Sequence, residues 1–567
     1  MDKKPAKSSK YYITTIILLI YLLIPNIYLA FHGSDFVLAS FFKIFLFLLL
    51  SFLLLCIPLL FLRPKVLFII GIIFAVLAPF EIVNIYLFKA SINAGIIFSV
   101  INTTPKEAIE LLRGILPLSI LGFSYIGFYI YFVIKYIPLS FRIKNKIKLY
   151  LGILFIISLL LVWIHDKWIS IKSIKSEYSQ KIFWEGTNNF NTDFGKIFPY
   201  SSIIQTKKTL VNISKMNAYK HHLINFQFYA TKKDQLNYAE KYVLVIGEAS
   251  RRNNWQLYGY KRRTDPLLSK NKKLVLLSDF ASTADVTDIS IPLILSRATP
   301  DSFCISYKEK TIVSAFKESG FKTYWISNQG IFNSDLSRFT NDVDKIYNLN
   351  NKIDFAGNYD EHIFPYIDSI LSKNDKKQFI VINLMGSHFR YNFRYPEKFN
   401  VFKPGFNGAS DYMMISPKNK EKLVNIYDNS ILYSDYILSE IIRKFEKTTS
   451  LSYVFFLSDH GENLYDDKSE RFGHASESPS KYEIQVPFII WTSNLYDSVY
   501  SQKMTGLKLN KDKRTSTSNL FYSLLDAANI GFRNERSEKS IFSNNFKEDS
   551  VRKVIVPSMK VVIFDRK

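Results

Sequence analysis

The residues best suited to chemistry lie near the end of the chain, in the run VFFLSDHGENLY. Asp459 and His460 stand side by side just after four apolar residues and a serine. Adjacent oxygen and nitrogen donors suit a zinc ion. A glycine with acidic neighbours after such a run is also typical of a strand that ends in a turn. The run alone leaves both interpretations open.

The elements that would position this pair are short apolar, β-rich runs in the second half of the chain. Five of them follow one another, at 242–247, 322–327, 379–384, 453–458 and 486–491. Amphipathic stretches such as 309–319 and 422–446 lie between them. Apolar strands that alternate with helices predict an α/β fold with a mostly parallel sheet covered on both faces.

Polar residues collect where these runs end. Glu248 follows the first run, Asn328 the second and His388 the third, while Asp459 and His460 follow the fourth. Function gathers at the carboxyl ends of strands in such sheets. The strand ends therefore offer a set of carboxylates and imidazoles suited to zinc or manganese.

The first 165 residues have a different character, because long apolar runs dominate them. Five spans of about the length that a membrane-crossing helix needs are predicted, at 11–30, 36–62, 66–88, 114–134 and 148–165. Basic residues cluster in the N-terminal tail, at Arg63 and Lys65, and over 135–148. The positive-inside rule puts these in the cytoplasm, so everything after about residue 165 is expected on the opposite side.

We therefore expect three parts: an N-terminal all-α five-helix transmembrane domain at 1–165, a connecting segment at 166–238 and a catalytic domain at 239–567. The net charge of +24 would suit nucleic acid or an anionic lipid surface. A domain outside the cytoplasm argues against nucleic acid as a partner. Two cysteines, Cys56 and Cys304, exclude a cysteine-rich zinc site and argue against a disulfide framework.

Motifs in a fixed order run along the second half of the chain: YVLVIGEASR with LYGYxRxTDP (242–266), TDISIP (287–292), GSH (386–388), SDHGE (458–462), FGH (472–474) and VPFIIW (486–491). This order resembles the phosphoethanolamine transferases of Gram-negative envelopes. Those are inner-membrane enzymes with five spans and a periplasmic domain of the alkaline phosphatase and sulfatase fold. The TDP and RYP details, at 264–266 and 394–396, are closest to the branch that modifies the core heptose of lipopolysaccharide.

The resemblance implies a role for each matching position. Glu248, Asp459 and His460 match the ligands of a catalytic zinc, and Thr287 matches the nucleophile, which also contacts that zinc. Two histidines match groups that hold the substrate phosphate, or a second zinc when one is bound: His388 and His474. Other substrate contacts are expected from two amides and from the outer loop at 89–113: Asn328, Asn383, Ser99, Thr103 and Glu107.

One position departs from the family pattern. Members commonly have H-x-x-G-x-H, whereas this chain has Asn383 at the first of these histidines. An amide donates hydrogen bonds but cannot supply a proton. We therefore assign proton delivery to His474 or His388.

The implied reaction is a two-step transfer. Thr287 takes phosphoethanolamine from phosphatidylethanolamine, releases diacylglycerol, and passes the group to lipopolysaccharide on a core heptose or lipid A. Zinc lowers the pKa of a bound water to about 7, and a threonine hydroxyl should benefit similarly. We expect a monomer in the bacterial inner membrane, with several spans, the N-terminus in the cytoplasm and the catalytic domain in the periplasm.

Two rival functions remain open. A glycerol-phosphate transferase that uses phosphatidylglycerol has the same architecture and a threonine nucleophile, and a non-catalytic membrane scaffold would need no chemistry at all. A sulfatase reaction is not expected, because the cysteine of the globular half, Cys304, lacks the C-x-P-x-R sequence that formylglycine chemistry needs.

Overall fold

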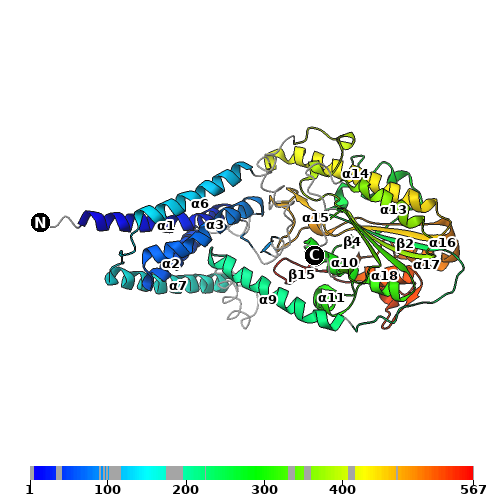
Figure 1. The fold of residues 1–567 in the computed structure, drawn as a ribbon, viewed down its shortest axis with the longest axis horizontal. Coiled ribbons are helices and arrows are strands. Elements are labelled where there is room, and N and C mark those ends of the chain that lie inside the picture. The colour runs from blue at the N-terminus through cyan, green and yellow to red at the C-terminus, as the bar shows by residue number, and fades with distance from the viewer. Residues whose placement is uncertain are drawn as a thin grey trace. The chain divides into compact units, whose positions relative to one another are not determined.

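The structure is a computed structural model. It describes residues 5–33, 41–88, 91–92, 96–97, 100, 116–173, 196–223, 225–329, 339–349, 359–406, 415–467 and 470–565. The chain divides into two compact units (Figure 1). One is built from Met1–Ile97 and Ile115–Leu210, and the other mainly from Val211–Lys567.

Long apolar helices make up the first unit. The described ones are α1 (Pro5–His32), α2 (Phe41–Cys56, continued by a 3₁₀ turn at Ile57–Leu60), α3 (Pro64–Phe88), α6 (Leu116–Tyr136) and α7 (Asn145–Ser173); α9 (Tyr200–Leu223) follows. A helix satisfies its backbone hydrogen bonds internally, which a segment surrounded by lipid requires.

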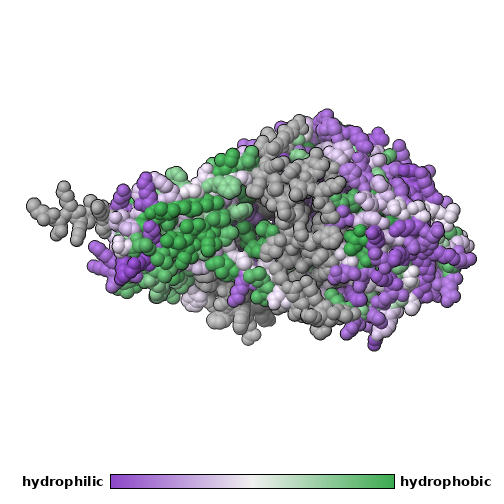
Figure 2. All heavy atoms as spheres, viewed as in Figure 1, coloured by the Kyte–Doolittle hydropathy of each residue, from purple (hydrophilic) through white to green (hydrophobic). Residues whose placement is uncertain are grey.

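Four of the helices in the described part of the chain are long and apolar enough to cross a membrane: Ser9–His32, Phe41–Leu60, Pro64–Tyr86 and Leu116–Tyr136. Many large apolar side chains are exposed on this unit, and on the face shown in Figure 2 they form a broad hydrophobic area. Such a surface is unfavourable in water and natural in a bilayer. The described parts of the first four predicted spans are thus mostly helical and apolar, as expected of a membrane protein.

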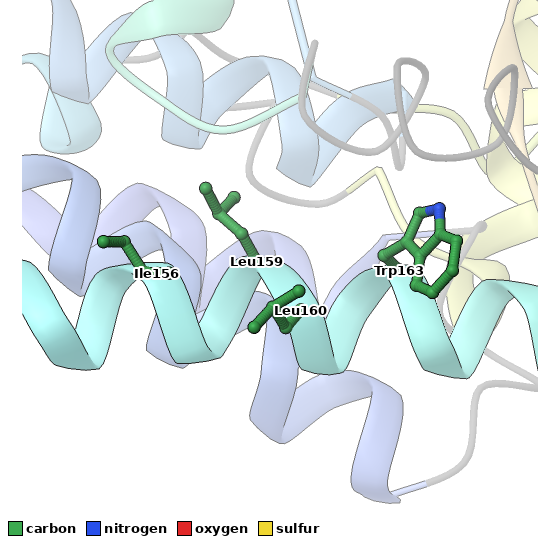
Figure 3. A pocket seen from close by; sticks show the side chains of 4 residues that line it. All are labelled: Ile156, Leu159, Leu160 and Trp163. Atoms are coloured by element: carbon green, nitrogen blue, oxygen red, sulfur yellow. The ribbon is translucent and has the colours of Figure 1, made fainter.

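The fifth predicted span, 148–165, lies within α7 but is not among those four helices. Ile156, Leu159, Leu160 and Trp163 line an apolar pocket of about 520 Å³ on this helix (Figure 3). The Ile156 side chain is 60% exposed and that of Leu160 is 53% exposed. This face of α7 suits lipid, and the fifth span stays a prediction.

A seven-stranded sheet forms the centre of the second unit. Its order is β3 (Val275–Leu276), β11 (Phe488–Thr492), β8 (Leu451–Ser458), β2 (Glu240–Gly247), β7 (Lys377–Asn383), β5 (Lys322–Ser327) and β6 (Lys345–Asn348). The neighbours from β8 to β6 pair in parallel, whereas β11 runs antiparallel to both β8 and β3. The expected mostly parallel sheet is confirmed. The strand predicted at 486–491, which is β11, runs in the opposite direction to its two neighbours.

Helices make up much of the rest of the second unit. They are α10 (Thr287–Leu295), α11 (Ile305–Lys308), α12 (Ile312–Glu318), α13 (Phe364–Leu371), α14 (Lys420–Glu446), α15 (Lys481–Ile484), α16 (Asn494–Val499), α17 (Ser501–Asn510) and α18 (Leu520–Ala527). In Figure 1, α13 and α14 lie on one side of the sheet and α18 lies on the other. Tyr242, Leu244 and Ile246 of β2 belong to the main core cluster, together with residues of α10, α12 and α18.

Short strands complete this unit in pairs outside the main sheet: β1 (Thr231–Lys232) with β13 (Ile530–Gly531), β4 (Phe280–Ala281) with β12 (Thr515–Ser516), β9 (Asn463–Leu464) with β10 (Phe472–Gly473), and β14 (Lys553–Ile555) with β15 (Val561–Ile563). Since β8, β2, β7 and β5 are parallel, their carboxyl ends meet at one edge of the sheet. The predicted site residues follow these ends.

Candidate metal centre

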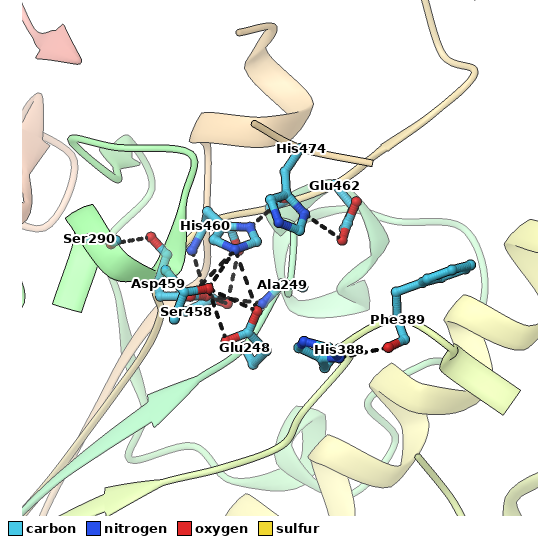
Figure 4. Close-up of polar contacts among 12 residues, drawn as sticks. Glu248, Ala249, Ser290, His388, Phe389, Ser458, Asp459, His460, Glu462 and His474 are labelled. Carbon is cyan, nitrogen blue, oxygen red and sulfur yellow. Dashed lines mark hydrogen bonds and ion pairs between the residues drawn. The ribbon is translucent and has the colours of Figure 1, made fainter. Parts of the chain in front are cut away.

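The polar residues that follow β2 and β8 meet at the carboxyl edge of the sheet. These strands are hydrogen-bonded neighbours, with Gly247 opposite Ser458, so the residues one step further along are also adjacent. Ligand atoms of Glu248, Asp459 and His460 all lie within 4.8 Å of one another (Figure 4). The structure thus brings together the three predicted metal ligands.

The predicted nucleophile lies beside these ligands. Thr287 is the first residue of α10. Its Oγ1 lies 3.2 Å from Nε2 of His460 and 3.3 and 3.4 Å from the two carboxylate oxygens of Glu248. The hydroxyl of Thr287, the fourth group that the resemblance assigns to the metal centre, therefore lies next to the other three.

The donor atoms fit a zinc ion. Oδ1 of Asp459 accepts hydrogen bonds from the backbone N–H groups of Ala249 and His460, at 3.0 and 2.7 Å, whereas its buried Oδ2 has no hydrogen-bond partner. Nδ1 of His460 lies 2.9 Å from the carbonyl oxygen of Gly461. Since a carbonyl only accepts, Nδ1 carries a proton, and Nε2 is the nitrogen that can give its lone pair to a metal.

The electrostatics also favour a cation. Burial, followed by the negative charge of Glu248, raises the pKa of Asp459 to about 7. Burial lowers the pKa of His460, but the charges of Asp459 and Glu248 outweigh it and raise that pKa well above its ordinary value, so the metal-free imidazole is protonated. Burial pushes the pKa of Glu248 upward too, but the hydrogen bond and charge of the protonated His460 hold the pKa of Glu248 below its ordinary value. A metal would bind in place of the Nε2 proton. Two buried carboxylates this close repel each other, and a bound cation would relieve the repulsion. Zinc accepts oxygen and imidazole ligands of this kind.

The two predicted histidines lie close to this centre. The ring centroids of His474 and His460 are 4.0 Å apart, and Nδ1 of His474 lies 3.0 Å from Oε1 of Glu462. Nδ1 of His388 lies 2.6 Å from the carbonyl oxygen of Phe389 (Figure 4). Because each partner can only accept, both Nδ1 atoms carry protons. Glu462 had no role in the sequence interpretation, and its spacing two residues after His460 was the only available signal.

The predicted amides are buried next to the centre. Nδ2 of Asn328 donates to Asp360 at 2.8 Å, and Nδ2 of Asn383 donates to Oε1 of Gln329 at 3.1 Å. Gln329 in turn donates to Oε2 of Glu248 at 2.9 Å. Sequence reasoning missed Gln329, because an amide in a turn after a strand is too common to signal a site.

The remaining predicted contacts belong to the outer loop. Ser99, Thr103 and Glu107 lie outside the described residues. Their roles stay predictions.

Gly386 lets the GSH turn approach Glu248. Its φ is +48°, and a Cβ at this position would lie 2.8 Å from the backbone N and 2.9 Å from the backbone O of Glu248. Since these are backbone atoms, Gly386→Ala must displace the residue that carries the carboxylate. We expect its zinc affinity, measured by competition with a chelating dye, to fall about 10- to 100-fold, as for other groups that orient a metal ligand.

Gly320→Ala is the matched control. Gly320 also has a positive φ, +86°, but a Cβ at this position would have nothing within 4 Å. This variant carries the strain of a left-handed residue, about 1–2 kcal/mol, and should bind zinc as the parent does. Equal zinc affinity in the two variants would contradict the steric explanation.

Comparison with known proteins agrees with this geometry. A sequence model of the sulfatase family matches residues 240–530. The phosphoethanolamine transferase EptC of Escherichia coli strain K12 is 27% identical over 329 residues, which are 56% of this chain and 56% of that protein. The alignment therefore spans little more than half of the relative.

Two solved structures share the fold. The lipooligosaccharide phosphoethanolamine transferase A (EptA) of Neisseria meningitidis, an integral membrane protein, has a TM-score of 0.75 at 20% identity and covers 93% of this chain and 97% of its own. The C-terminal periplasmic domain of Escherichia coli EptC, solved in complex with zinc, has a TM-score of 0.54 at 24% identity and covers 59% of this chain and 95% of its own.

The likeness to phosphoethanolamine transferases inferred from the motifs is confirmed by these relatives. The expected architecture, an apolar helical region followed by an alkaline phosphatase and sulfatase-like domain, is confirmed as well. Since the family match covers more than half of the chain, this protein belongs to the sulfatase family.

Proposed function

We propose that this protein transfers phosphoethanolamine from phosphatidylethanolamine to lipopolysaccharide, on a core heptose or lipid A, through a covalent intermediate on Thr287. The observation that carries the proposal is the position of the Thr287 hydroxyl, 3.2 Å from His460 and 3.3 Å from Glu248. The names of the similar proteins support phosphoethanolamine as the transferred group.

Glu248, Asp459 and His460 would hold one zinc ion, and Thr287 lies within reach of the same position. When bound, zinc supplies Lewis acidity that makes a nearby hydroxyl a stronger acid. The chain's own residues fix the orientation of these groups, because Asp459 and His460 are both buried and hydrogen-bonded to backbone. A second zinc would use His388 and His474.

In the first step, Oγ1 of Thr287 forms a bond to phosphorus while the bond from phosphorus to the diacylglycerol oxygen breaks. Thr287 loses one proton and the leaving oxygen gains one. A single imidazole can therefore accept the first proton and return it to the leaving group. We assign this task to Nε2 of His474 or His388, since Nδ1 of each is held by an acceptor.

In the second step, an acceptor oxygen on lipopolysaccharide forms a bond to phosphorus and the bond to Thr287 breaks. The acceptor loses a proton and Thr287 regains one, so the same imidazole suffices again. Asn328 and Asn383, together with Ser99, Thr103 and Glu107, are proposed to contact the lipid substrates.

Both substrates are lipids, which requires a membrane location. We propose that residues 1–165 form the transmembrane domain, with 148–165 as its fifth span. Residues 166–238 would connect this domain to the catalytic domain, residues 239–567, in the periplasm. The cytoplasmic N-terminus follows from the basic residues of the tail and of 135–148. We propose that the enzyme works as a monomer in the inner membrane.

Mass spectrometry of protein purified from membranes that contain phosphatidylethanolamine tests the proposal. We expect a phosphoethanolamine adduct on the peptide that contains Thr287. A glycerol-phosphate adduct on the same residue would replace the proposed donor by phosphatidylglycerol. An unmodified Thr287 in a protein that binds no zinc would favour the scaffold.

A further inference from the structure

A buried amide chain runs from β7 to the carboxylate of Glu248. Gln329 follows β5, is only 9% exposed, and donates from Nε2 to Oε2 of Glu248 at 2.9 Å and to the carbonyl of Leu384 at 2.8 Å. Its Oε1 accepts from Nδ2 of Asn383 at 3.1 Å. Gln329 thus uses both of its amide hydrogens and its carbonyl oxygen within the protein.

We propose that Gln329, oriented by Asn383, is a positioning residue that holds Oε2 of Glu248 and so makes Glu248 a zinc ligand through Oε1 alone. This inference rests on the zinc site of the proposed function. It assigns Asn383 to the metal centre through Gln329 and not only to the substrate. Asn383, which stands where the family usually has a histidine, would then act on the metal ligand Glu248 through the side-chain amide of Gln329.

Chemistry fixes the orientation of both amides. A carboxylate and a backbone carbonyl only accept hydrogen bonds, so the atom of Gln329 that faces Glu248 and Leu384 must be its nitrogen. The other end of that amide is then oxygen and needs a donor. Asn383 must present its nitrogen there. The relay therefore has one consistent direction, with hydrogen donated from Asn383 to Gln329 and from Gln329 to Glu248.

The sheet holds the members of this relay in register. Ser327 of β5 and Ile246 of β2 are both opposite Asn383 of β7, and the backbone N–H of Asn328 donates to the carbonyl of Asn383 at 2.9 Å. The relay thus crosses three neighbouring strand ends, whose relative positions are set by ladder hydrogen bonds. Such a support can fix the angle of a carboxylate more tightly than a loop could.

The arrangement at Glu248 repeats the arrangement at Asp459. Backbone N–H groups occupy Oδ1 of Asp459 and leave Oδ2 without a hydrogen-bond partner. Gln329 occupies Oε2 of Glu248, while Oε1 lies 3.4 Å from Nε2 of His460. Each carboxylate then offers one oxygen, which together with His460 makes three donors. Three protein donors and one open position are the pattern of a catalytic zinc.

Replacing Gln329 by methionine tests the relay, because methionine has a similar volume and no hydrogen-bond donor at its end. We expect Gln329→Met to lower zinc affinity about 10- to 100-fold, the usual effect of losing a partner of a metal ligand. Asn383→Leu should lower it less, since Gln329 keeps both of its donor contacts. Competition with a chelating dye, on the full-length protein in detergent, measures both affinities without any transfer reaction.

Gln378→Met is the matched control. Gln378 is fully buried near the start of β7 and donates to the carbonyl of Ile370 at 2.8 Å, far along the strand from Asn383. Gln378→Met should lower the melting temperature of the metal-free protein about as much as Gln329→Met does. Its zinc affinity should stay within about twofold of that of the parent. Equal zinc affinities in Gln329→Met and Gln378→Met would overturn the relay.

The two proposals fail in different ways. If zinc binding requires Glu248 and Gln329 but no phosphoethanolamine appears on Thr287, the relay stands and the transfer reaction is refuted. If Thr287 is loaded in the parent while Gln329→Met binds zinc like the parent, the transfer stands and the relay is refuted.

Discussion

Replacing Thr287 by alanine is expected to lower the rate of phosphoethanolamine transfer by at least about a thousandfold, as loss of a nucleophile does in other covalent enzymes. The hydroxyl lies 3.2 Å from His460 and 3.3 Å from Glu248, and no other described hydroxyl has both of these contacts. Transfer from labelled phosphatidylethanolamine to lipopolysaccharide, measured in mixed micelles, gives the rate. The covalent adduct should disappear in the same variant.

Two further variants make the result specific. Thr287→Ser keeps a hydroxyl at the same place and should retain both the adduct and measurable transfer. Thr283→Ala removes a buried hydroxyl with no hydrogen-bond partner, four residues earlier, and should leave the rate within about twofold of the parent. An adduct or full transfer in Thr287→Ala would refute Thr287 as the nucleophile.

Removal of zinc is expected to destabilise the protein as well as inactivate it. A ligand that binds the folded state alone adds about 4 kcal/mol to the free energy of unfolding at a thousand times its Kd. Without the ion, Glu248 and Asp459 stay buried close together, and burial, followed by the charge of Glu248, raises the pKa of Asp459 to about 7. Calorimetry with and without a strong chelator should show a large drop in melting temperature.

Metal specificity provides the control for that experiment. Zinc should restore both the melting temperature and transfer, whereas magnesium should restore neither, because it demands six oxygen ligands in octahedral geometry. If the chelator left the melting temperature of the parent protein unchanged, that result would contradict a metal held by Glu248, Asp459 and His460.

Much of the sheet could be predicted, because its central strands are buried on both faces and therefore appear as unbroken apolar runs. The strand predicted at 322–327 has those bounds in the structure, and the one predicted at 242–247 begins two residues earlier, at Glu240. The reversed direction of β11 could not be predicted, since an apolar strand has the same composition whichever way it runs.

The centre itself was predictable for the residues that stand directly after strands. Glu248, Asp459 and His460 together follow the ends of two predicted strands, and the parallel order of β2 and β8 brings them together. Gln329 and Glu462 could not be predicted as site residues, because their contacts with the centre come from neighbours on other strands or beyond a turn. Gln329 needs Asn383 of β7, a contact that only the order of strands in the sheet creates.

The two cysteines also have a practical consequence. Both are free; Cys56 is buried and Cys304 is exposed. Cys304 immediately precedes α11, and its neighbours Phe303 and Ile305 pack against the apolar cluster that contains Val286 and Ile289 at the start of α10. A thiol-reactive fluorophore would therefore attach at one place, beside the helix whose first residue is Thr287, without any engineered label site.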